Sequence, residues 1–215
     1  MLGTDRQART FVSSASQSRR IFMKLLFLQD FHMDAQGGGT YILRRMCGFA
    51  PEFGVEYQFV YDLNGEGPYP SSDYPSTAIR TRRRQYRFGL GRLVGLATIL
   101  GWDASARQQI RRAIDAFEPD ALHIVAHGVS FPLMAREALR TGLPVYLSVH
   151  DLWPETVRPY IPRRWAHGLF GRIARKAEKL FVVSDEMGEY LEEQYGLNNW
   201  AVVHDGSDES PSAQP

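Results

Sequence analysis

Residues 118–150 read EPDALHIVAHGVSFPLMAREALRTGLPVYLSVH, and this stretch decides the fold. The apolar run 121–126 is typical of a strand that is buried on both faces of a sheet. A helix predicted over 132–140 ends at Gly142, and a second apolar run covers 145–149. Strand, helix and strand in this order predict a βαβ unit, in which a right-handed crossover joins two parallel strands.

The same alternation continues on both sides of this unit. Further strands are predicted over 25–28, 55–61, 180–183 and 200–203, and further helices over 41–49, 93–100, 104–117, 163–179 and 185–195. Residues 62–78 contain three prolines among glycine, serine and aspartate, and are predicted to form a long loop. The fold class is therefore α/β: a single Rossmann-like, doubly wound, mostly parallel sheet with helices on both faces.

Length and composition fit one globular domain. The chain has 215 residues, of which 44% are hydrophobic and 23% charged, so a disordered chain is excluded. We expect residues 1–22 to be a disordered tail, 23–206 to be the domain, and 207–215 to be a disordered tail or a truncated linker. The net charge of +1 does not require nucleic acid as a partner.

Cysteine content and hydropathy bear on the compartment. Cys47 is the only cysteine, which excludes an internal disulfide and a zinc site built from cysteines. No apolar run reaches the ~18–20 residues that cross a bilayer. We expect a cytoplasmic protein, and a peripheral position on the inner face of a membrane is the alternative.

The first candidate site follows the first predicted strand. Gly37, Gly38, Gly39 and Thr40 stand at the start of a helix, where free N–H groups and the positive end of the dipole favour an anion. The pattern is neither a dinucleotide fingerprint nor a P-loop. Either these residues contact a phosphate or a sugar, or they form a turn that only the chain geometry requires.

The second candidate site follows the strand 145–149. His150 can exchange protons near neutral pH, and the adjacent Asp151 can orient it. Trp153 either stacks on a sugar face or belongs to the core. In the plainer alternative His150 satisfies backbone groups at the strand end, although the carboxyl end of a strand favours a functional role.

Other polar residues at strand ends are weaker candidates. His127 follows the strand 121–126 and is expected to bind substrate, whereas His123 lies inside that strand and is expected to be buried and hydrogen-bonded. Ser184 and Glu186 begin a helix, so capping explains them first and contact with a ligand hydroxyl is an addition. No metal-ligand spacing is present, so we expect no protein-bound metal.

A basic run precedes the apolar helix 93–100. Arg80 to Arg92 contains no acidic residue, and its candidates for contact with an anionic membrane surface are Arg82, Arg83, Arg84 and Arg87. The alternative is a solvated loop followed by a core helix. We expect no nucleic-acid partner, because no aromatic stacking platform accompanies these arginines.

Four motifs in order resemble the amino-terminal domain of family 4 glycosyltransferases, over residues 23–206. They are Gly37-Gly38-Gly39-Thr40, Glu118-Pro119-Asp120-Ala121-Leu122-His123-Ile124, Gly142-Leu143-Pro144-Val145 leading to His150-Asp151, and the run from Ala177 to Met187. The resemblance implies one half of a GT-B enzyme, in which two Rossmann-like domains face each other. This half would receive a glycan or lipid-linked acceptor, and the other half would hold the nucleotide-sugar donor.

The resemblance also implies roles and a mechanism. Gly37 to Gly39 would lie near the donor phosphates, and His150 would contact the transferred sugar as the catalytic residue. Transfer would retain the anomeric configuration without a metal or another cofactor, the nucleotide sugar being a co-substrate. The product would be a cell-surface polysaccharide or a glycolipid.

The donor domain of this family would follow residue 206. Its phosphate clamp and its Glu-x₇-Glu motif are expected there; Glu178 and Glu186 have that spacing but flank a strand, so we reject the match. We therefore expect negligible transfer by these 215 residues without a donor domain, in cis or in trans. Alternatives are a non-catalytic carbohydrate- or protein-binding module and an S-adenosylmethionine- or nucleotide-binding enzyme, which only Asp62 favours.

Overall fold

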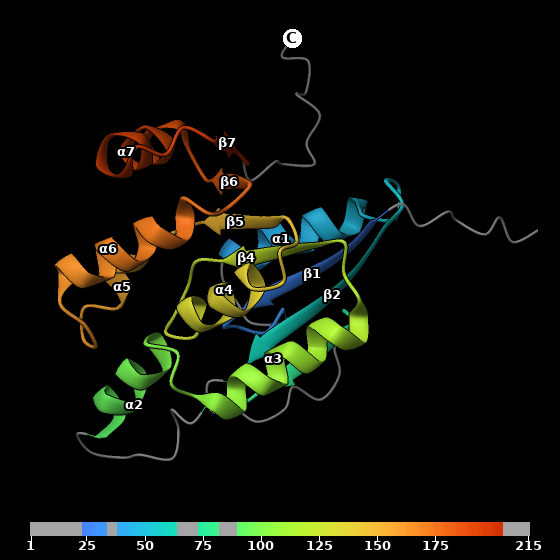
Figure 1. Ribbon diagram of the computed structural model, residues 1–215. Coiled ribbons are helices and arrows are strands. Elements are labelled where there is room, and N and C mark those ends of the chain that lie inside the picture. Colours follow the sequence, from blue (N-terminus) through green and yellow to red (C-terminus); the bar gives the residue numbers. More distant parts are fainter. Residues whose placement is uncertain (1–22, 34–37, 64–72, 82–89, 204–215) are drawn as a thin grey trace, which may run out of the picture.

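The protein forms one parallel sheet covered by helices (Figure 1). The structure, a computed structural model, describes residues 23–33, 38–63, 73–81 and 90–203. The strands are β1 (Met23–Gln29), β2 (Val55–Asp62), β3 (Ser76–Ile79), β4 (Ala121–Val125), β5 (Val145–Val149), β6 (Lys179–Val182) and β7 (Trp200–Val202). Their order in the sheet is β3-β2-β1-β4-β5-β6-β7, and all neighbouring strands are parallel.

The direction of the chain across the sheet reverses beside β1. From β1 the chain runs outward to β2 and β3, and it then returns to place β4 on the other side of β1, with Leu28 opposite Ile124. The connections after β1 and β4 therefore leave toward opposite faces. A crevice for ligands forms at such a switch point in open α/β sheets.

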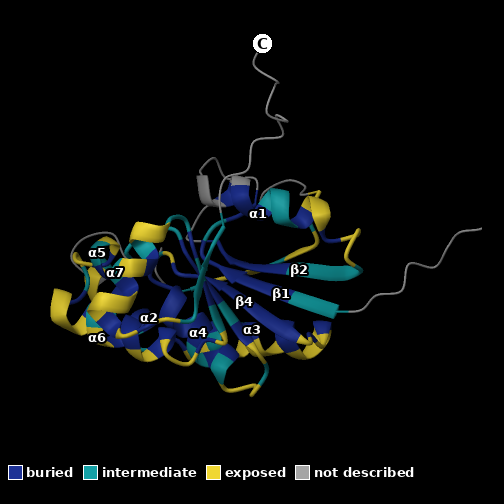
Figure 2. Ribbon diagram, turned by 90° about the horizontal axis from the view of Figure 1, so that it is seen from above, coloured by how far each residue is buried: buried dark blue, intermediate teal, exposed yellow. Residues whose placement is uncertain are grey.

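Helices cover both faces, as the sequence predicts. They are α1 (Gly38–Phe49), α2 (Leu90–Ile99), α3 (Ala104–Phe117), α4 (Phe131–Leu139), α5 (Trp153–Thr156), α6 (Arg163–Ala174) and α7 (Asp185–Tyr195). Figure 2 shows α1 on one face of the sheet and α3 and α4 on the other. The doubly wound α/β fold is confirmed.

Alternate residues of β1, β2 and β4 supply two cores. Leu26, Leu28 and Ile124 pack with α3 and α4 in the larger core. Phe27 and Val125 face the other way, with the smaller core beneath α1. This arrangement explains the almost continuous apolar runs, because both faces of the central strands are buried.

Polar caps and glycines set the helix boundaries. The carboxylate of Asp103 accepts a hydrogen bond from the Ala106 N–H at 3.0 Å, which starts α3. Gly196 ends α7 in the left-handed conformation, with φ of 69°. Both boundaries lie where the sequence predicts them.

The structure differs from the prediction in three places. Part of the predicted loop 62–78 is the edge strand β3, in which Ile79 alone is buried, so no apolar run announces it. The basic helix ends at Ala174 instead of Lys179, because Lys179 already pairs with Tyr146 in the sheet. The short helix α5 was not predicted. The predicted tails 1–22 and 207–215 lie outside the described residues. The domain boundaries therefore stay a prediction.

Candidate functional site

A buried carboxylate and a half-exposed imidazole meet at the switch point. Asp30 follows β1 directly, and His127 comes two residues after β4. Nδ1 of His127 lies 2.6 Å from Oδ1 of Asp30, and the exposed fractions of the side chains are 47% and 2% respectively. Among the described residues, Nε2 of His127 has no hydrogen-bond partner.

The backbone around His127 is shaped to fit this pair. Gly128 has φ of +62°, and a Cβ atom there would lie 1.2 Å from Oδ2 of Asp30. The carbonyl of Gly128 accepts a hydrogen bond from Nε1 of Trp153 at 2.6 Å. The ring of Phe31 packs edge-on against His127, with 5.6 Å between the ring centroids. Asp30 and Phe31, both in the loop after β1, thus contact the imidazole directly, and Trp153 holds the backbone next to it.

Trp153 belongs to the core and is not a sugar-stacking residue. Its side chain is fully buried, and its ring lies 5.2 Å from that of Phe131. The sequence left sugar stacking and a core position open for this tryptophan, and the core position is correct. Its contribution to the site is indirect, through the hydrogen bond to Gly128.

The electrostatics of the edge favour a protonated His127. The hydrogen bond to Asp30 raises the pKa of His127, burial opposes this, and the charges of Asp30 and Asp151 raise the pKa further. Asp151 is exposed and belongs to the loop after β5. The loops after β4 and β5 leave neighbouring strands at the same edge, which accounts for its effect on this pKa.

His150 follows β5 at the same edge and is partly buried. It lies near enough to His123 for its charge to lower the pKa of that buried histidine, after burial itself, to about 3. The structure therefore brings the loops that carry Asp30, His127, His150 and Asp151 to one edge of the sheet. The roles of these residues toward a substrate stay predictions.

His123 has the structural role that the sequence predicts. Its Nε2 is hydrogen-bonded to the hydroxyl of Ser148 at 2.7 Å, and its side chain is buried. Its ring lies between those of Phe27 and Phe181, with centroid distances of 4.8 and 5.7 Å. A histidine enclosed in this way stays neutral at physiological pH.

The glycine motif stands at the start of α1. Gly38, Gly39 and Thr40 form the first turn of the helix, which contains no acidic residue, and Thr40 is buried. Gly37 lies outside the described residues. The motif follows β1, so the helix begins at the same edge of the sheet as Asp30, the edge where the strands end. Contact with a phosphate or a sugar stays a prediction.

The structure shows the capping role of the motif after β6. The hydroxyl of Ser184 accepts a hydrogen bond from the Met187 N–H at 3.3 Å and caps α7. A hydrogen bond from Ser184 also lowers the pKa of Glu186, which is exposed. Contact of these two residues with a ligand hydroxyl stays a prediction.

The membrane-surface candidates Arg82, Arg83, Arg84 and Arg87 lie outside the described residues. The helices of the described part are all too short or too polar to cross a membrane. Within the same residues, no three His, Cys, Asp or Glu side chains gather in a way that could hold a metal ion. The expectation of a metal-free site stays a prediction.

Sequence reasoning missed Asp30 as a site residue. The available signal was its position, because a carboxylate directly after an apolar run stands at the carboxyl edge of the sheet. The missing information was the strand order. Only the neighbouring positions of β1 and β4 bring Asp30 to His127.

Comparison with known families gives one match. The family model described as Glycosyltransferase Family 4 matches residues 36–210. Among curated protein sequences, no match to the chain is found.

Solved structures share the fold. An alpha-glucosyltransferase in complex with UDP and a 13-mer DNA is 14% identical, with a TM-score of 0.53 over 86% of this chain and 43% of its own. A putative UDP-N-acetylglucosamine 2-epimerase from Listeria monocytogenes is 12% identical, with a TM-score of 0.54 over 83% and 44%. The chain thus spans less than half the length of these proteins. The DNA in the first complex means that this fold alone does not exclude a nucleic-acid partner.

Proposed function

The chain belongs to Glycosyltransferase Family 4, and on this premise we propose that it is the acceptor-side domain of a retaining GT-B glycosyltransferase. It binds a glycan or lipid-linked acceptor and completes a transfer site together with a donor domain that holds a nucleotide sugar. One observation carries the proposal: the Asp30–His127 pair stands at the switch point, beside the loop of His150. Open α/β sheets bind their ligands at this place.

His127 has the chemistry to hold a sugar hydroxyl. In the neutral form, Nδ1–H donates to Asp30 and Nε2 accepts a hydrogen bond from a ligand hydroxyl. In the protonated form, which Asp30 favours, Nε2–H donates to a hydroxyl oxygen or to an anion. Because Asp30 is buried and keeps the ring in place, either form meets the ligand in a fixed orientation.

His150 is proposed as the residue that contacts the transferred sugar. It follows β5, which is the neighbour of β4, so its loop borders that of His127. A sugar between the two loops would meet both imidazoles. In a retaining transfer of this kind the leaving phosphate takes the proton of the acceptor hydroxyl, so the two histidines orient groups and no protein nucleophile is needed.

The charges at the edge explain why a second domain is needed. The described parts of the loops after β1, β4 and β5 contain two aspartates, Asp30 and Asp151, and neither lysine nor arginine. A departing diphosphate requires cations in a closed cleft. The first turn of α1 supplies only the partial positive charge of a helix end. In this proposal a donor domain supplies the remaining positive charge.

A glycan-binding screen tests the proposal on the full chain. Purified protein is applied to an array of glycans and then titrated calorimetrically with the best ligand and with nucleotide sugars. We expect binding of one glycan class, with affinity about tenfold or more lower in His127→Ala and in His150→Ala, because a lost hydrogen bond in a ligand site costs about this much.

His167→Ala is the matched control, because His167 lies on α6 with its Nδ1 hydrogen-bonded to Tyr195 and does not follow a strand. It should bind the glycan as the unaltered chain does. Absence of glycan binding, or binding that neither His127→Ala nor His150→Ala weakens, would contradict the proposal.

A further inference from the structure

A cavity lies where α2, α4 and α6 meet, and none of its lining residues belongs to the loops that carry Asp30, His127 and His150. It has a volume of about 320 Å³. Its wall combines three arginines with apolar side chains: Arg136, Arg164, Arg172, Ile161, Trp165 and Leu169. We call it the arginine pocket. Figure 1 shows α2 beside the first turns of α6, at the end of the molecule where the strands finish.

Among the residues that the structure describes, no carboxylate forms an ion pair with an arginine of the pocket. Among the described residues neither Arg164 nor Arg172 takes part in an ion pair. Arg136 donates a hydrogen bond to the carbonyl of Leu100. Its pKa is lowered by burial first, and then by the charges of Arg172 and other arginines. Like charges held this close oppose each other, and a bound anion would relieve them.

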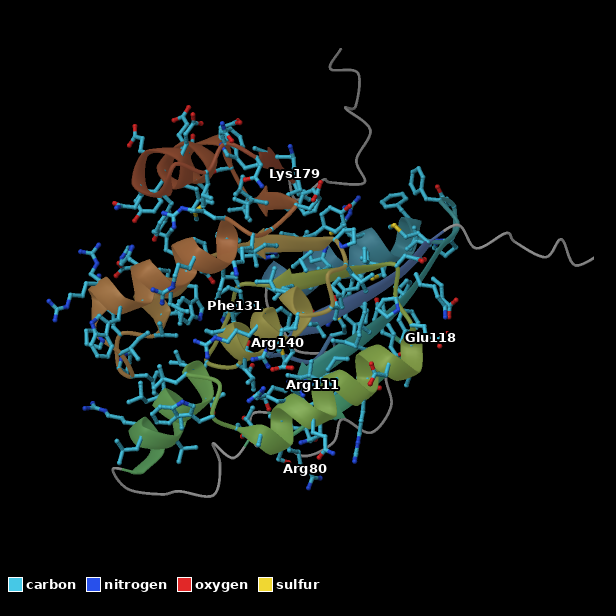
Figure 3. The ribbon with its side chains drawn as sticks, in the orientation of Figure 1. Arg80, Arg111, Glu118, Phe131, Arg140 and Lys179 are labelled. Atoms are coloured by element: carbon cyan, nitrogen blue, oxygen red, sulfur yellow. The ribbon has the colours of Figure 1, made fainter. Side chains whose placement is uncertain are left out.

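The carboxylate nearest to Arg136 along the chain, that of Glu137, is already paired with other arginines. Glu137, next to Arg136 on α4, forms ion pairs with Arg107 at 2.8 Å, Arg111 at 2.5 Å and Arg140 at 2.9 Å. Figure 3 shows Arg111 and Arg140 converging between α3 and α4. Glu137 therefore neutralises a different group of arginines, and the pocket keeps its positive charge.

The other half of the pocket wall is apolar and partly exposed to solvent. Trp165 is 56% exposed, although Ile161 and Leu169 beside it are buried. Two more large apolar side chains are exposed on or beside α2, namely Leu93 (62%) and Trp102 (71%). An inorganic anion would satisfy the arginines and leave this apolar surface in water. A ligand with an anionic head and an apolar tail would cover both.

We propose that the arginine pocket binds an organic phosphate ester that carries an apolar chain. The phosphate lies among Arg164, Arg172 and the remaining donors of Arg136, since guanidinium groups bind phosphate as rigid forks. The chain lies along Trp165. The proposal does not depend on sugar transfer, because none of these residues belongs to the loops of His127 and His150.

Titration with short-chain lipids tests the ligand chemistry on the full chain. The probes are dihexanoyl phosphatidic acid as monomers, glycerol 3-phosphate, which lacks the chains, and dihexanoyl phosphatidylcholine, which lacks the net charge. Tryptophan fluorescence and calorimetry report binding. We expect phosphatidic acid to bind about tenfold or more tightly than either other probe, because each of them loses one half of the contacts.

Two arms distinguish the source of the ligand. Sedimentation with phosphatidylcholine vesicles, with and without phosphatidic acid, reports binding to a membrane surface; monomeric lipid in the titration reports binding of a free molecule. Binding in either arm supports the pocket. A single-stranded oligonucleotide that binds more tightly than phosphatidic acid would assign the arginines to nucleic acid and overturn the proposal.

Charge-removing variants locate the site. Arg164→Gln combined with Arg172→Gln should weaken binding of phosphatidic acid about tenfold or more, because two charge-assisted contacts are lost. Arg112→Gln, on the exposed side of α3, is the control for general charge and should bind as the unaltered chain does. Equal affinity of the double variant and the unaltered chain, or an equal loss in Arg112→Gln, would overturn the proposal.

Discussion

His127 and Asp30 are 97 residues apart in the sequence, and the neighbouring strands β4 and β1 bring the imidazole Nδ1 to 2.6 Å from the carboxylate Oδ1. The carboxylate is buried and the imidazole is half-exposed. The fold thus holds one partner inside the protein and leaves the other partly open to solvent.

Replacing Asp30 by Asn should lower the pKa of His127 toward its ordinary value of 6.5. The amide can still accept a hydrogen bond but no longer carries the charge that favours the imidazolium. Titration of the His127 ring protons by NMR measures this pKa. An unchanged pKa in Asp30→Asn would mean that the carboxylate does not control the ring.

The same pair predicts how the free energy of unfolding depends on pH. The pKa of His127 is raised in the folded state, so the pair stabilises the fold fully below the ordinary pKa of 6.5. This stabilisation is lost as the pH rises through the higher pKa of the folded state. Urea unfolding at a series of pH values should show the loss in the unaltered chain and not in Asp30→Asn.

Gly128→Ala should destabilise the protein by about 1–3 kcal/mol and displace Asp30, because the left-handed backbone is strained and the new Cβ overlaps the carboxylate. Gly142→Ala is the matched control, since Gly142 has φ of +75° with no atom within 4 Å of the added Cβ. Both variants carry the backbone strain. Urea unfolding that gives equal losses for the two would show that contact with Asp30 costs nothing.

Glu137→Gln should lower the free energy of unfolding at neutral pH by about 1–3 kcal/mol, because three arginines lose a buried charged partner. Burial alone would raise the pKa of Glu137, but the hydrogen bonds and charges of Arg111 and Arg107 hold it below its ordinary value. The stabilisation is thus present above that ordinary value and lost as the pH falls through the lower pKa of the folded state.

Acid unfolding of the two proteins measures this difference. The stability curves of Glu137→Gln and the unaltered chain should converge at low pH, where the carboxylate is protonated in both states. Curves that stay parallel down to low pH would assign the loss to packing instead of charge.

The 215-residue chain should release negligible nucleoside diphosphate from nucleotide sugars in the presence of an acceptor. The described parts of the loops after β1, β4 and β5 contain neither lysine nor arginine to stabilise the leaving diphosphate. A coupled assay for the released diphosphate, repeated with a family 4 donor domain added in trans, measures this. Robust turnover by the chain alone would show that the cleft is already complete.

Local patterns sufficed to predict the central elements. The apolar run of β5 and the glycine and proline before it gave its bounds of Val145 and Val149 correctly. The buried role of His123 also followed from its apolar neighbours. The edge strand β3 escaped prediction, because a strand with one solvent-exposed side and a single buried residue has no apolar run.

The candidate site could be predicted only in part. Position after a strand was enough to select His127 and His150, because all parallel strands end at one edge. The partnership of His127 with Asp30, and the core position of Trp153, depend on which strands are neighbours. No spacing in the sequence encodes that order, because Asp30 in the loop after β1 and His127 in the loop after β4 are 97 residues apart.

The place of β1 between β2 and β4 has a consequence for biosynthesis. β2 follows within the first third of the chain, so one side of β1 finds its partner early. The other side must wait until β4, ending at Val125, has emerged from the ribosome. Until then a nascent chain exposes a row of unpaired amide and carbonyl groups beside Phe27 and Leu28, an edge of the kind that pairs with other chains.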